Sequence, residues 1–244
     1  MWHRPDGTIS LLGDEDLTDY HSPLGEGAGA LLAQYLESRP PGSRYRFDSL
    51  PAEAAGDLAS ATEAAGAVPH EAAFRIDLPA SFDDFLAGLS KKERHEMRRK
   101  HRRFDEALGP PRLLAGTPDP VGAFVDLHRL AEGRKGKFMT REREGFFRDL
   151  AALPEARVDI LAGAGGAPVA ASIGFQDERA FYLYNSAYDP AAAASSPGMV
   201  LLWKLFESVI DDGVVLFDFL KGDEAYKLRL GAEPRPLFVL EGQT

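Results

Sequence analysis

The sequence of 244 residues predicts a mixed α/β protein in which a central sheet carries helices on both faces. Two observations favour this fold class. Three strand-like segments between residues 158 and 188 are joined by tight turns, which indicates an antiparallel meander, and helices and strands then alternate to the end of the chain. No GxGxxG sequence follows an early strand, so a doubly wound dinucleotide-binding fold is not predicted.

The composition is that of a globular protein, with 44% hydrophobic and 27% charged residues. No apolar run is long enough to cross a bilayer, and the first six residues lack the apolar core of a signal peptide, so we expect a cytoplasmic protein without a membrane partner. The sequence has no cysteine, which excludes disulfides, thiolate metal ligands and a cysteine nucleophile. Its six histidines form no HExxH or closely spaced pair, so no metal centre is predicted.

Positive charge is concentrated in one segment of a protein whose net charge is −10. Residues 91–103 hold eight lysines and arginines against two carboxylates, Glu93 and Glu96, so the rest of the chain is strongly acidic. An acidic body argues against general nucleic-acid binding, which depends on neutralising many phosphates. The local patch is either the solvated face of a helix or a site for one anionic ligand.

The part of the chain after residue 80 begins with helical patterns. From Ser81, a suitable N-cap, apolar residues recur at nearly helical spacing as far as Leu108, which predicts one long amphipathic helix. A short strand is expected over residues 112–115. Two further helices, separated by a loop rich in glycine and lysine, are expected over residues 121–132 and 141–150.

The meander and the elements behind it form the rest of the predicted sheet. The three strands of the meander are expected over residues 158–162, 169–175 and 181–188. Ser196, Pro197 and Gly198 then open an apolar helix to about Asp211, with serine as its cap and proline at its first position. A buried strand, a short helix and a last strand follow, over residues 214–220, 223–230 and 236–240.

An internal repeat appears when the chain is shifted by 170 residues, because seven of twenty positions then match without a gap. The matching residues are Leu31, Leu32, Glu37, Ser38, Phe47, Asp48 and Leu50, paired with Leu201, Leu202, Glu207, Ser208, Phe217, Asp218 and Leu220. We predict that residues 1–80 form a truncated half-copy of the unit in residues 81–244; the alternative is two ordinary helix–strand units. A half-copy would expose a sheet edge and an apolar face, which a homodimer contact or an upstream segment would cover.

Two segments near the end of the chain resemble a known family. They are the helix start at Ser196, Pro197 and Gly198 and the sequence FDFLKGDEAYKLRLG from Phe217 to Gly231. Both are similar to acyltransferases of the GNAT superfamily, in the FemABX-like branch that includes acetyltransferases of the cellulose-biosynthesis type. The resemblance implies a GNAT fold with an acyl donor, usually acetyl-CoA or another acyl-CoA, in a V-shaped opening between the central strands. It also implies an amine acceptor, for which polysaccharide and cell-envelope precursors are candidates.

The same resemblance leaves two donors open, because FemABX-like relatives use aminoacyl-tRNA. The glycine-rich Q/RxxGxG/A phosphate loop of the superfamily is replaced here by residues 191–195 and the single Gly198. A helix N-terminus nevertheless presents unsatisfied N–H groups and partial positive charge, so the start of this helix is a candidate site for a pyrophosphate. The candidate donor-binding residues are Ser196, Gly198, Met199 and Val200, and the alternative is a well-capped core helix.

Acyl transfer to an amine needs a base for the amine proton and an acid for the departing thiolate. The resemblance places the acid at Tyr226. Asp218 lies inside an apolar strand, where alternation turns it to the face opposite Phe217 and Phe219, and it is the candidate base or acceptor-orienting residue. His128, on a helix that the fold would place beside the acceptor, is the other candidate base. A packing tyrosine, a bonded buried carboxylate and a core histidine are the structural alternatives.

Charged residues crowd the turn between the last buried strand and the short helix. Lys221, Glu224 and Lys227 are candidate substrate-binding groups there, since the carboxyl ends of strands in open α/β sheets commonly hold ligands. Tyr184 and Tyr188 are expected on one face of their strand, where they would line an acceptor pocket. Solvated turn charges and core tyrosines are the structural alternatives. A non-catalytic GNAT-like binding module is the alternative to an enzyme.

Overall fold

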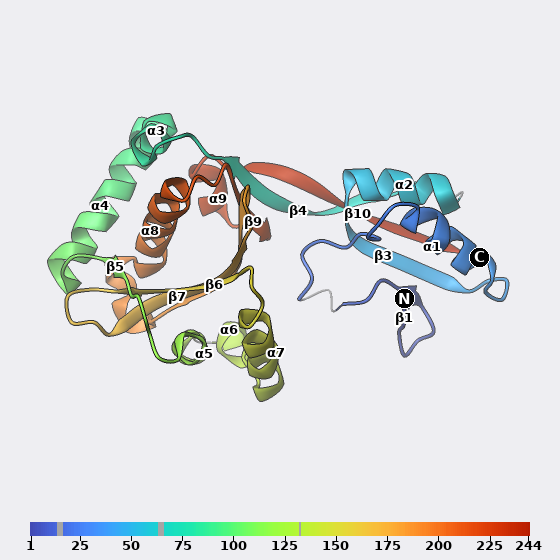
Figure 1. The fold of residues 1–244 in the computed structure, drawn as a ribbon, viewed down its shortest axis with the longest axis horizontal. Coiled ribbons are helices and arrows are strands. Elements are labelled where there is room, and N and C mark those ends of the chain that lie inside the picture. Colours follow the sequence, from blue (N-terminus) through green and yellow to red (C-terminus); the bar gives the residue numbers. More distant parts are fainter. Residues whose placement is uncertain (14–16, 63–65, 132) are drawn as a thin grey trace. The chain divides into compact units, whose positions relative to one another are not determined.

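The computed structural model describes residues 1–13, 17–62, 66–131 and 133–244. The chain divides into two compact units (Figure 1). The first unit contains Met1–Phe74, Leu220–Glu224 and Glu233–Thr244, and the second contains Arg75–Phe219 and Ala225–Ala232. Residues near the C-terminus are therefore shared between the two units.

The first unit is built on a small sheet with two helices. The strands β1 (Trp2–His3) and β2 (Ile9–Ser10) pair antiparallel, β2 is parallel to β3 (Arg44–Pro51), and β3 pairs antiparallel with β10 (Glu233–Gln243). The helices α1 (Ala28–Glu37) and α2 (Ala52–Thr62) pack on each other, and the core includes Phe47, Leu50 and Leu58. The last strand of the chain thus completes the first unit, while β4 (Val68–Asp77) begins in the first unit and ends in the second.

The second unit holds a mixed sheet with the strand order β9-β8-β7-β6-β5. Its strands are β5 (Arg112–Leu113), β6 (Ala156–Ala162), β7 (Pro168–Gln176), β8 (Ala180–Tyr188) and β9 (Leu216–Lys221). The strands from β5 to β8 pair antiparallel in turn, and β9 runs parallel to β8. The antiparallel meander and the mixed sheet predicted from the sequence are confirmed.

Helices cover both faces of this sheet, as predicted (Figure 1). They are α3 (Phe82–Gly88), α4 (Lys91–Leu108), α5 (Pro120–Leu130), α6 (Gly133–Phe138), α7 (Arg141–Ala151), α8 (Pro197–Asp211) and α9 (Ala225–Arg229). The apolar helix α8 lies on one face, where the Phe206 ring is 4.5 Å from that of Phe217, and α3 and α4 pack against it. On the other face α5 and α7 bury a separate core around Phe124, Phe147 and Ile173.

The predicted single helix over residues 81–108 is wrong, because the structure breaks it into α3 and α4. Leu89 is extended, and the Ser90 hydroxyl caps α4. The Arg94 guanidinium donates a 2.9 Å hydrogen bond to the Ala87 carbonyl, one of the groups that the end of α3 leaves unsatisfied. The apolar spacing continues across the break, so periodicity does not reveal it.

Smaller differences concern the ends of elements. Ser196 is the N-cap of α8, as predicted, but it is left-handed, with φ of 54°, and among the described residues its side chain makes no capping hydrogen bond. Proline at the first position of α8 is confirmed. A 3-10 helix at Pro190–Ser195 precedes α8, and α6 lies in the predicted loop.

The residues of the internal repeat fall on corresponding elements. In the first unit they lie along α1, its C-cap and β3, and their partners lie along α8 and β9. Each copy of the repeat therefore lies on a helix and on a strand that follows it. The two aspartates of the repeat are both buried, with 3% of Asp48 and 2% of Asp218 exposed.

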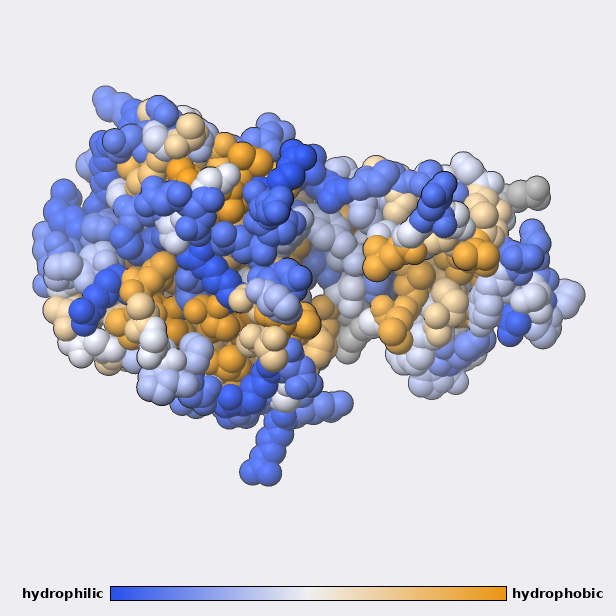
Figure 2. Space-filling view, viewed as in Figure 1, coloured by the Kyte–Doolittle hydropathy of each residue, from blue (hydrophilic) through white to orange (hydrophobic). Residues whose placement is uncertain are grey.

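Large apolar side chains are exposed on the first unit. Leu12, Leu24 and Leu31 are 78%, 89% and 66% exposed. Figure 2 shows an apolar area on the visible face of this unit. Within the part of the chain that the structure describes, no helix combines the length and the apolar composition that a bilayer crossing requires.

Candidate functional site

The strands β8 and β9 of the second unit are paired over only part of their length. Their parallel pairing begins at Ala180 and Leu216 and, among the described residues, ends at Tyr182 and Asp218. β8 continues for six residues beyond this point, to Tyr188. The pairing therefore ends in the region where the resemblance places the V-shaped opening.

A β-bulge in β8 redistributes the tyrosines that the sequence assigned to one face. Ile173 pairs with Asn185, whereas the next residue of β7 pairs with Leu183, so Tyr184 is the extra residue. The Tyr184 ring contacts Phe147 of α7, with centroids 5.8 Å apart. Tyr184 therefore packs in the core on the α5 and α7 side of the sheet.

Tyr188 lies on the other side of the sheet, beside the start of α8. A β-carbon added to Gly198 would be 3.6 Å from Cδ1 of Tyr188. Tyr188 is 41% exposed. The predicted shared face of Tyr184 and Tyr188 is wrong, because the bulge inverts the alternation between them.

A groove of about 670 Å³ lies within the second unit, between α4, the start of α8 and α9. Its apolar lining comes from Met97, Met199 and Leu230, and Tyr226 lies beside them. The charged and titratable lining groups are Lys91, Lys92, Glu93, His95, Glu96, Lys100 and Arg229. The groove thus brings the predicted acid Tyr226 together with Met199 at the start of α8 and with the predicted anion-binding patch of residues 91–103.

Cations outnumber carboxylates in this groove. Lys91, Lys92 and Arg229 form no ion pair with any residue that the structure describes, so their charges are available to a ligand. Glu96 is already engaged, because Arg99 donates two hydrogen bonds to its carboxylate at 2.7 and 2.8 Å. These bonds, together with the charges of Arg99 and Lys100, lower the pKa of Glu96 to about 2. The arrangement favours an anionic ligand.

The first turn of α8 offers fewer free amides than the sequence predicts. The amides of Met199 and Val200 donate to the Ser196 carbonyl at 3.1 and 3.2 Å, and Pro197 has no N–H. Val200 is also buried. Of the predicted donors in this turn, Gly198 retains an amide without a backbone partner among the described residues. An anion at the start of α8 would therefore depend on Gly198 and on the side-chain cations of the groove.

Tyr226 is half-buried at the start of α9. Its ring meets the Phe219 ring edge-on, with centroids 5.9 Å apart and an angle of 78° between the planes. Phe219 in turn contacts Phe206 of α8, so Tyr226 lies on the α8 side of the sheet. A phenol held beside a cationic groove can donate a proton to a leaving group there.

The two predicted bases lie away from the groove. Asp218 is buried in β9 on the face opposite Phe217 and Phe219, as the alternation predicts. His128 is 1% exposed and sits between the rings of Phe124 and Phe138, at 5.7 and 5.4 Å, in the core under α5. Neither residue lines the groove.

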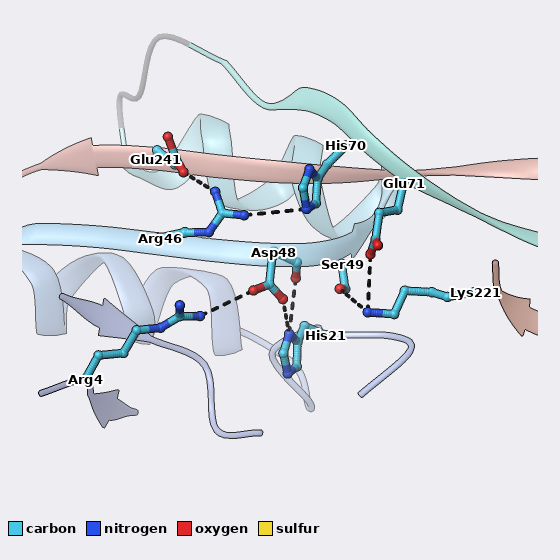
Figure 3. Close-up of polar contacts among 9 residues, drawn as sticks. All are labelled: Arg4, His21, Arg46, Asp48, Ser49, His70, Glu71, Lys221 and Glu241. Carbon is cyan, nitrogen blue, oxygen red and sulfur yellow. Dashed lines mark hydrogen bonds and ion pairs between the residues drawn. The ribbon is translucent and has the colours of Figure 1, made fainter. Parts of the chain in front are cut away.

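The predicted substrate-binding charges are divided between the units. Lys221 and Glu224 belong to the first unit. There the Lys221 ammonium is 3.1 Å from the Ser49 hydroxyl and 3.3 Å from a Glu71 carboxylate oxygen (Figure 3). Lys227 belongs to the second unit, is 2% exposed and is not part of the groove lining.

The same close-up shows the surroundings of the repeated Asp48. Its carboxylate accepts hydrogen bonds from His21 at 2.7 Å and from Arg4 at 3.4 Å (Figure 3). These bonds satisfy a buried carboxylate in the first unit. Asp48 is therefore a bonded buried carboxylate, which is the structural alternative given above for its counterpart Asp218.

One residue of the site, Arg229, is not among the predicted site residues. Arg229 joins the groove because it follows Tyr226 by almost one turn of α9, a relation that needs the exact helix start. The first unit has a glycine-rich segment of the kind that is missing before α8: glycines 25, 27 and 29 lie before and within α1. Together with Glu53 and Asp57 they line a second groove, of about 580 Å³. These carboxylates disfavour an anionic ligand in that second groove.

Comparisons with known proteins agree with this architecture. Residues 91–228, more than half of the chain, match the family model of the acetyltransferase (GNAT) domain. A search of curated protein sequences gives no significant match. Similar solved structures include a conserved protein of unknown function from Bacteroides thetaiotaomicron, with 15% identity, a TM-score of 0.65 and coverage of 89% of this chain and 76% of that one.

Two other solved structures show the same fold. The C-terminal domain of a putative lysylphosphatidylglycerol synthetase from Agrobacterium fabrum has 14% identity and a TM-score of 0.62, and the match covers 91% of this chain and 75% of that one. FemX has 12% identity and a TM-score of 0.62, with coverage of 90% and 79%. The order of helices and strands, the partial pairing of β8 with β9 and the match over residues 91–228 lead to one conclusion: the chain belongs to the GNAT acetyltransferase family, with a FemABX-like fold.

Proposed function

We propose that the second unit transfers an acyl group from acyl-CoA, most simply acetyl-CoA, to an amine. The observation that carries this proposal is the groove that joins Tyr226 to Lys91, Lys92 and Arg229, three cations without an ion-pair partner in the described part of the chain. Acyl-CoA presents phosphates next to an apolar arm, and the groove offers cations beside Met97 and Met199. The acceptor class that we favour is an amino group on a polysaccharide or cell-envelope precursor, and the proposal assumes the cytoplasmic location predicted from the sequence.

In the proposed reaction the amine nitrogen attacks the thioester carbonyl and the carbon–sulfur bond breaks. The Tyr226 hydroxyl donates its proton to the departing thiolate and recovers a proton from the nitrogen of the tetrahedral intermediate. The first ammonium proton passes to solvent, because the predicted base Asp218 is buried on the opposite face of β9 and does not line the groove. The amide product, free CoA thiol and one released proton balance the reaction.

A thiol-release assay tests this function. The protein is incubated with acetyl-CoA and, separately, with an amino sugar, a lysyl peptide, a diamine and no acceptor, and free CoA thiol is followed. Acceptor-dependent release that falls strongly in Tyr226→Phe supports the proposal. The proposal would be contradicted if none of the acceptors gave thiol release faster than the rate measured without protein.

An aminoacyl-tRNA donor is the second candidate, and one observation favours it. Arg98 and Arg102 are exposed on α4 and lie outside the groove. The cations of α4 thus extend over a longer stretch than the diphosphate of CoA would cover, which suits a longer polyanion such as tRNA. Titration with charged tRNA separates the two donors. Binding to tRNA that Arg102→Met weakens, with no binding to acetyl-CoA, would replace the CoA proposal.

A non-catalytic binding module and a homodimer are also open to direct tests. A module would bind acetyl-CoA without acceptor-dependent thiol release. The homodimer hypothesis rests on the exposed Leu12, Leu24 and Leu31 of the first unit, which a second copy would cover. Sedimentation equilibrium should give a dimer mass that Leu24→Lys lowers, and a concentrated protein that stays monomeric would refute the hypothesis.

A further inference from the structure

Lys227 is a buried lysine at the point where the candidate acid is held. It is 2% exposed, although taking an ammonium out of water is costly unless hydrogen bonds compensate for the lost hydration. Its Nζ donates a hydrogen bond of 3.3 Å to the Phe219 carbonyl. The same ammonium is 6.0 Å from the centroid of the Phe219 ring. Phe219 is thus a principal contact of the Lys227 side chain.

Phe219 is also the residue against which Tyr226 packs. The ring of Tyr226 lies edge-on to the ring of Phe219, at 5.9 Å. Phe219 itself is 3% exposed and is fixed by Phe217, with ring centroids 4.8 Å apart. One rigid residue therefore holds Lys227 through its carbonyl and Tyr226 through its ring.

The helix that carries both residues cannot fix Tyr226 by itself. α9 has five residues, Ala225–Arg229, and a helix of this length is not stable without tertiary contacts. Tyr226 and Lys227 are adjacent in it, so a bond that anchors the Lys227 side chain also restrains the backbone that carries Tyr226. The hydrogen bond from Lys227 to the Phe219 carbonyl is a polar contact that ties α9 to β9.

We infer that Lys227 is a positioning residue, which holds the Tyr226 hydroxyl in place through the Phe219 carbonyl and does not bind substrate. This assignment rests on the proposed acid role of Tyr226 and departs from the substrate-binding role that the sequence suggested for Lys227. Because Lys227 does not line the groove, its loss should leave donor affinity unchanged. The loss should act on turnover, since a misplaced acid protonates the thiolate less effectively.

A double-mutant cycle tests the inference in the full chain. Lys227→Met keeps the length of the side chain and removes its donor. We expect kcat to fall by about 10-fold with an unchanged Kd for acetyl-CoA. In a Tyr226→Phe background the same substitution should cause no further fall in kcat, because the hydroxyl that Lys227 positions is already absent. Lys204→Met, on the surface of α8, is the matched control that should retain full activity.

Three outcomes would overturn the inference: unchanged kcat in Lys227→Met, a raised Kd for acetyl-CoA, or an additional fall of equal size in the Tyr226→Phe background. If Lys227→Met does not fold, Lys227→Gln, which keeps an N–H donor on a shorter chain, enters the same cycle and should lose less activity than Tyr226→Phe. A wild-type protein without acyl transfer would refute the proposed function itself. The two failures can be distinguished, because the wild-type assay tests the proposed function and the comparison of variants tests the role of Lys227.

Discussion

Gly174 and Phe181 approach so closely that a β-carbon on Gly174 would lie 2.6 Å from Cζ of Phe181. The contact occurs beside the bulge that separates the faces of Tyr184 and Tyr188. Phe181 is fully buried, and a built β-carbon would also lie 2.6 Å from the Tyr182 carbonyl oxygen, so the surroundings cannot relax cheaply. Glycine is therefore required where β8 leaves its regular register.

Gly174→Ala should destabilise the protein by about 1 to 3 kcal/mol, the range for overpacking a tight core. Gly198→Ala is the matched control, since its added β-carbon would meet Tyr188 at an ordinary 3.6 Å. Urea unfolding of both variants measures the difference. Equal stability of the two alanine variants would contradict the close packing at the bulge.

Tyr226→Phe removes one hydroxyl and keeps the ring contact with Phe219. We expect kcat for acyl transfer to fall by about 100-fold, within the range for loss of a general acid, while the Kd for acetyl-CoA stays unchanged. Steady-state kinetics and calorimetry give the two quantities. Tyr35→Phe, on the surface of α1, serves as the control with full activity, and an active Tyr226→Phe enzyme would remove Tyr226 from the mechanism.

Lys92→Met should weaken donor binding because it removes from the groove a cation that no described residue neutralises in an ion pair. The expected loss is about 1 kcal/mol, or about fivefold in Kd, and it should diminish as salt rises. Arg102→Met is a matched control on the same helix, since Arg102 is outside the groove, with a side chain that is 65% exposed and pairs with Glu106. Equal weakening of acetyl-CoA binding in both variants would show that the cations of α4 act without regard to the groove.

The ion pair of Glu96 and Arg99 predicts a dependence of stability on pH. Hydrogen bonds from Arg99 lower the pKa of Glu96 to about 2, below its ordinary value of 4.5. A carboxylate whose pKa is lower in the folded state stabilises the protein above the unfolded value, and this contribution is lost as pH falls from 4.5 towards 2.

Glu96→Gln should therefore cost at most about 1 kcal/mol near pH 7, because a pair that is one-third exposed is screened by water. The difference from the wild-type protein should shrink as pH falls below 4.5. Urea unfolding of the two proteins at a series of pH values measures it. A difference that stays constant down to the acid limit would show that the Glu96 carboxylate is not held by Arg99.

The fold could be predicted where the spacing of apolar residues agrees with the positions of helix-starting and turn residues. Three alternating segments gave the meander, and Pro197 marked the start of α8. The break between α3 and α4 was missed because it is set by the Ser90 cap and the reach of Arg94, while the apolar spacing runs on. The bulge at Tyr184 depends on the pairing of two strands, which no single segment encodes.

The candidate site could be predicted in part. Tyr226 and Met199 do meet at one groove, and the basic patch of residues 91–103 lines it, as an anion site requires. Lys221 and Glu224 were grouped with Tyr226 because they are close in sequence, but the chain crosses between units within this turn. Lys227 also differs from the other charged residues of this turn, because it is buried. Its burial depends on tertiary packing, which the local sequence does not reveal.

The most direct test of the central claim is a calorimetric titration of the full chain with acetyl-CoA, with free CoA and a longer acyl-CoA as comparisons. Binding of acetyl-CoA at one site, with free CoA binding at similar strength and Lys92→Met weakening both, is the result that the groove of α4, α8 and α9 predicts. A folded protein that binds none of the three ligands would contradict the assignment of this groove to an acyl-CoA donor.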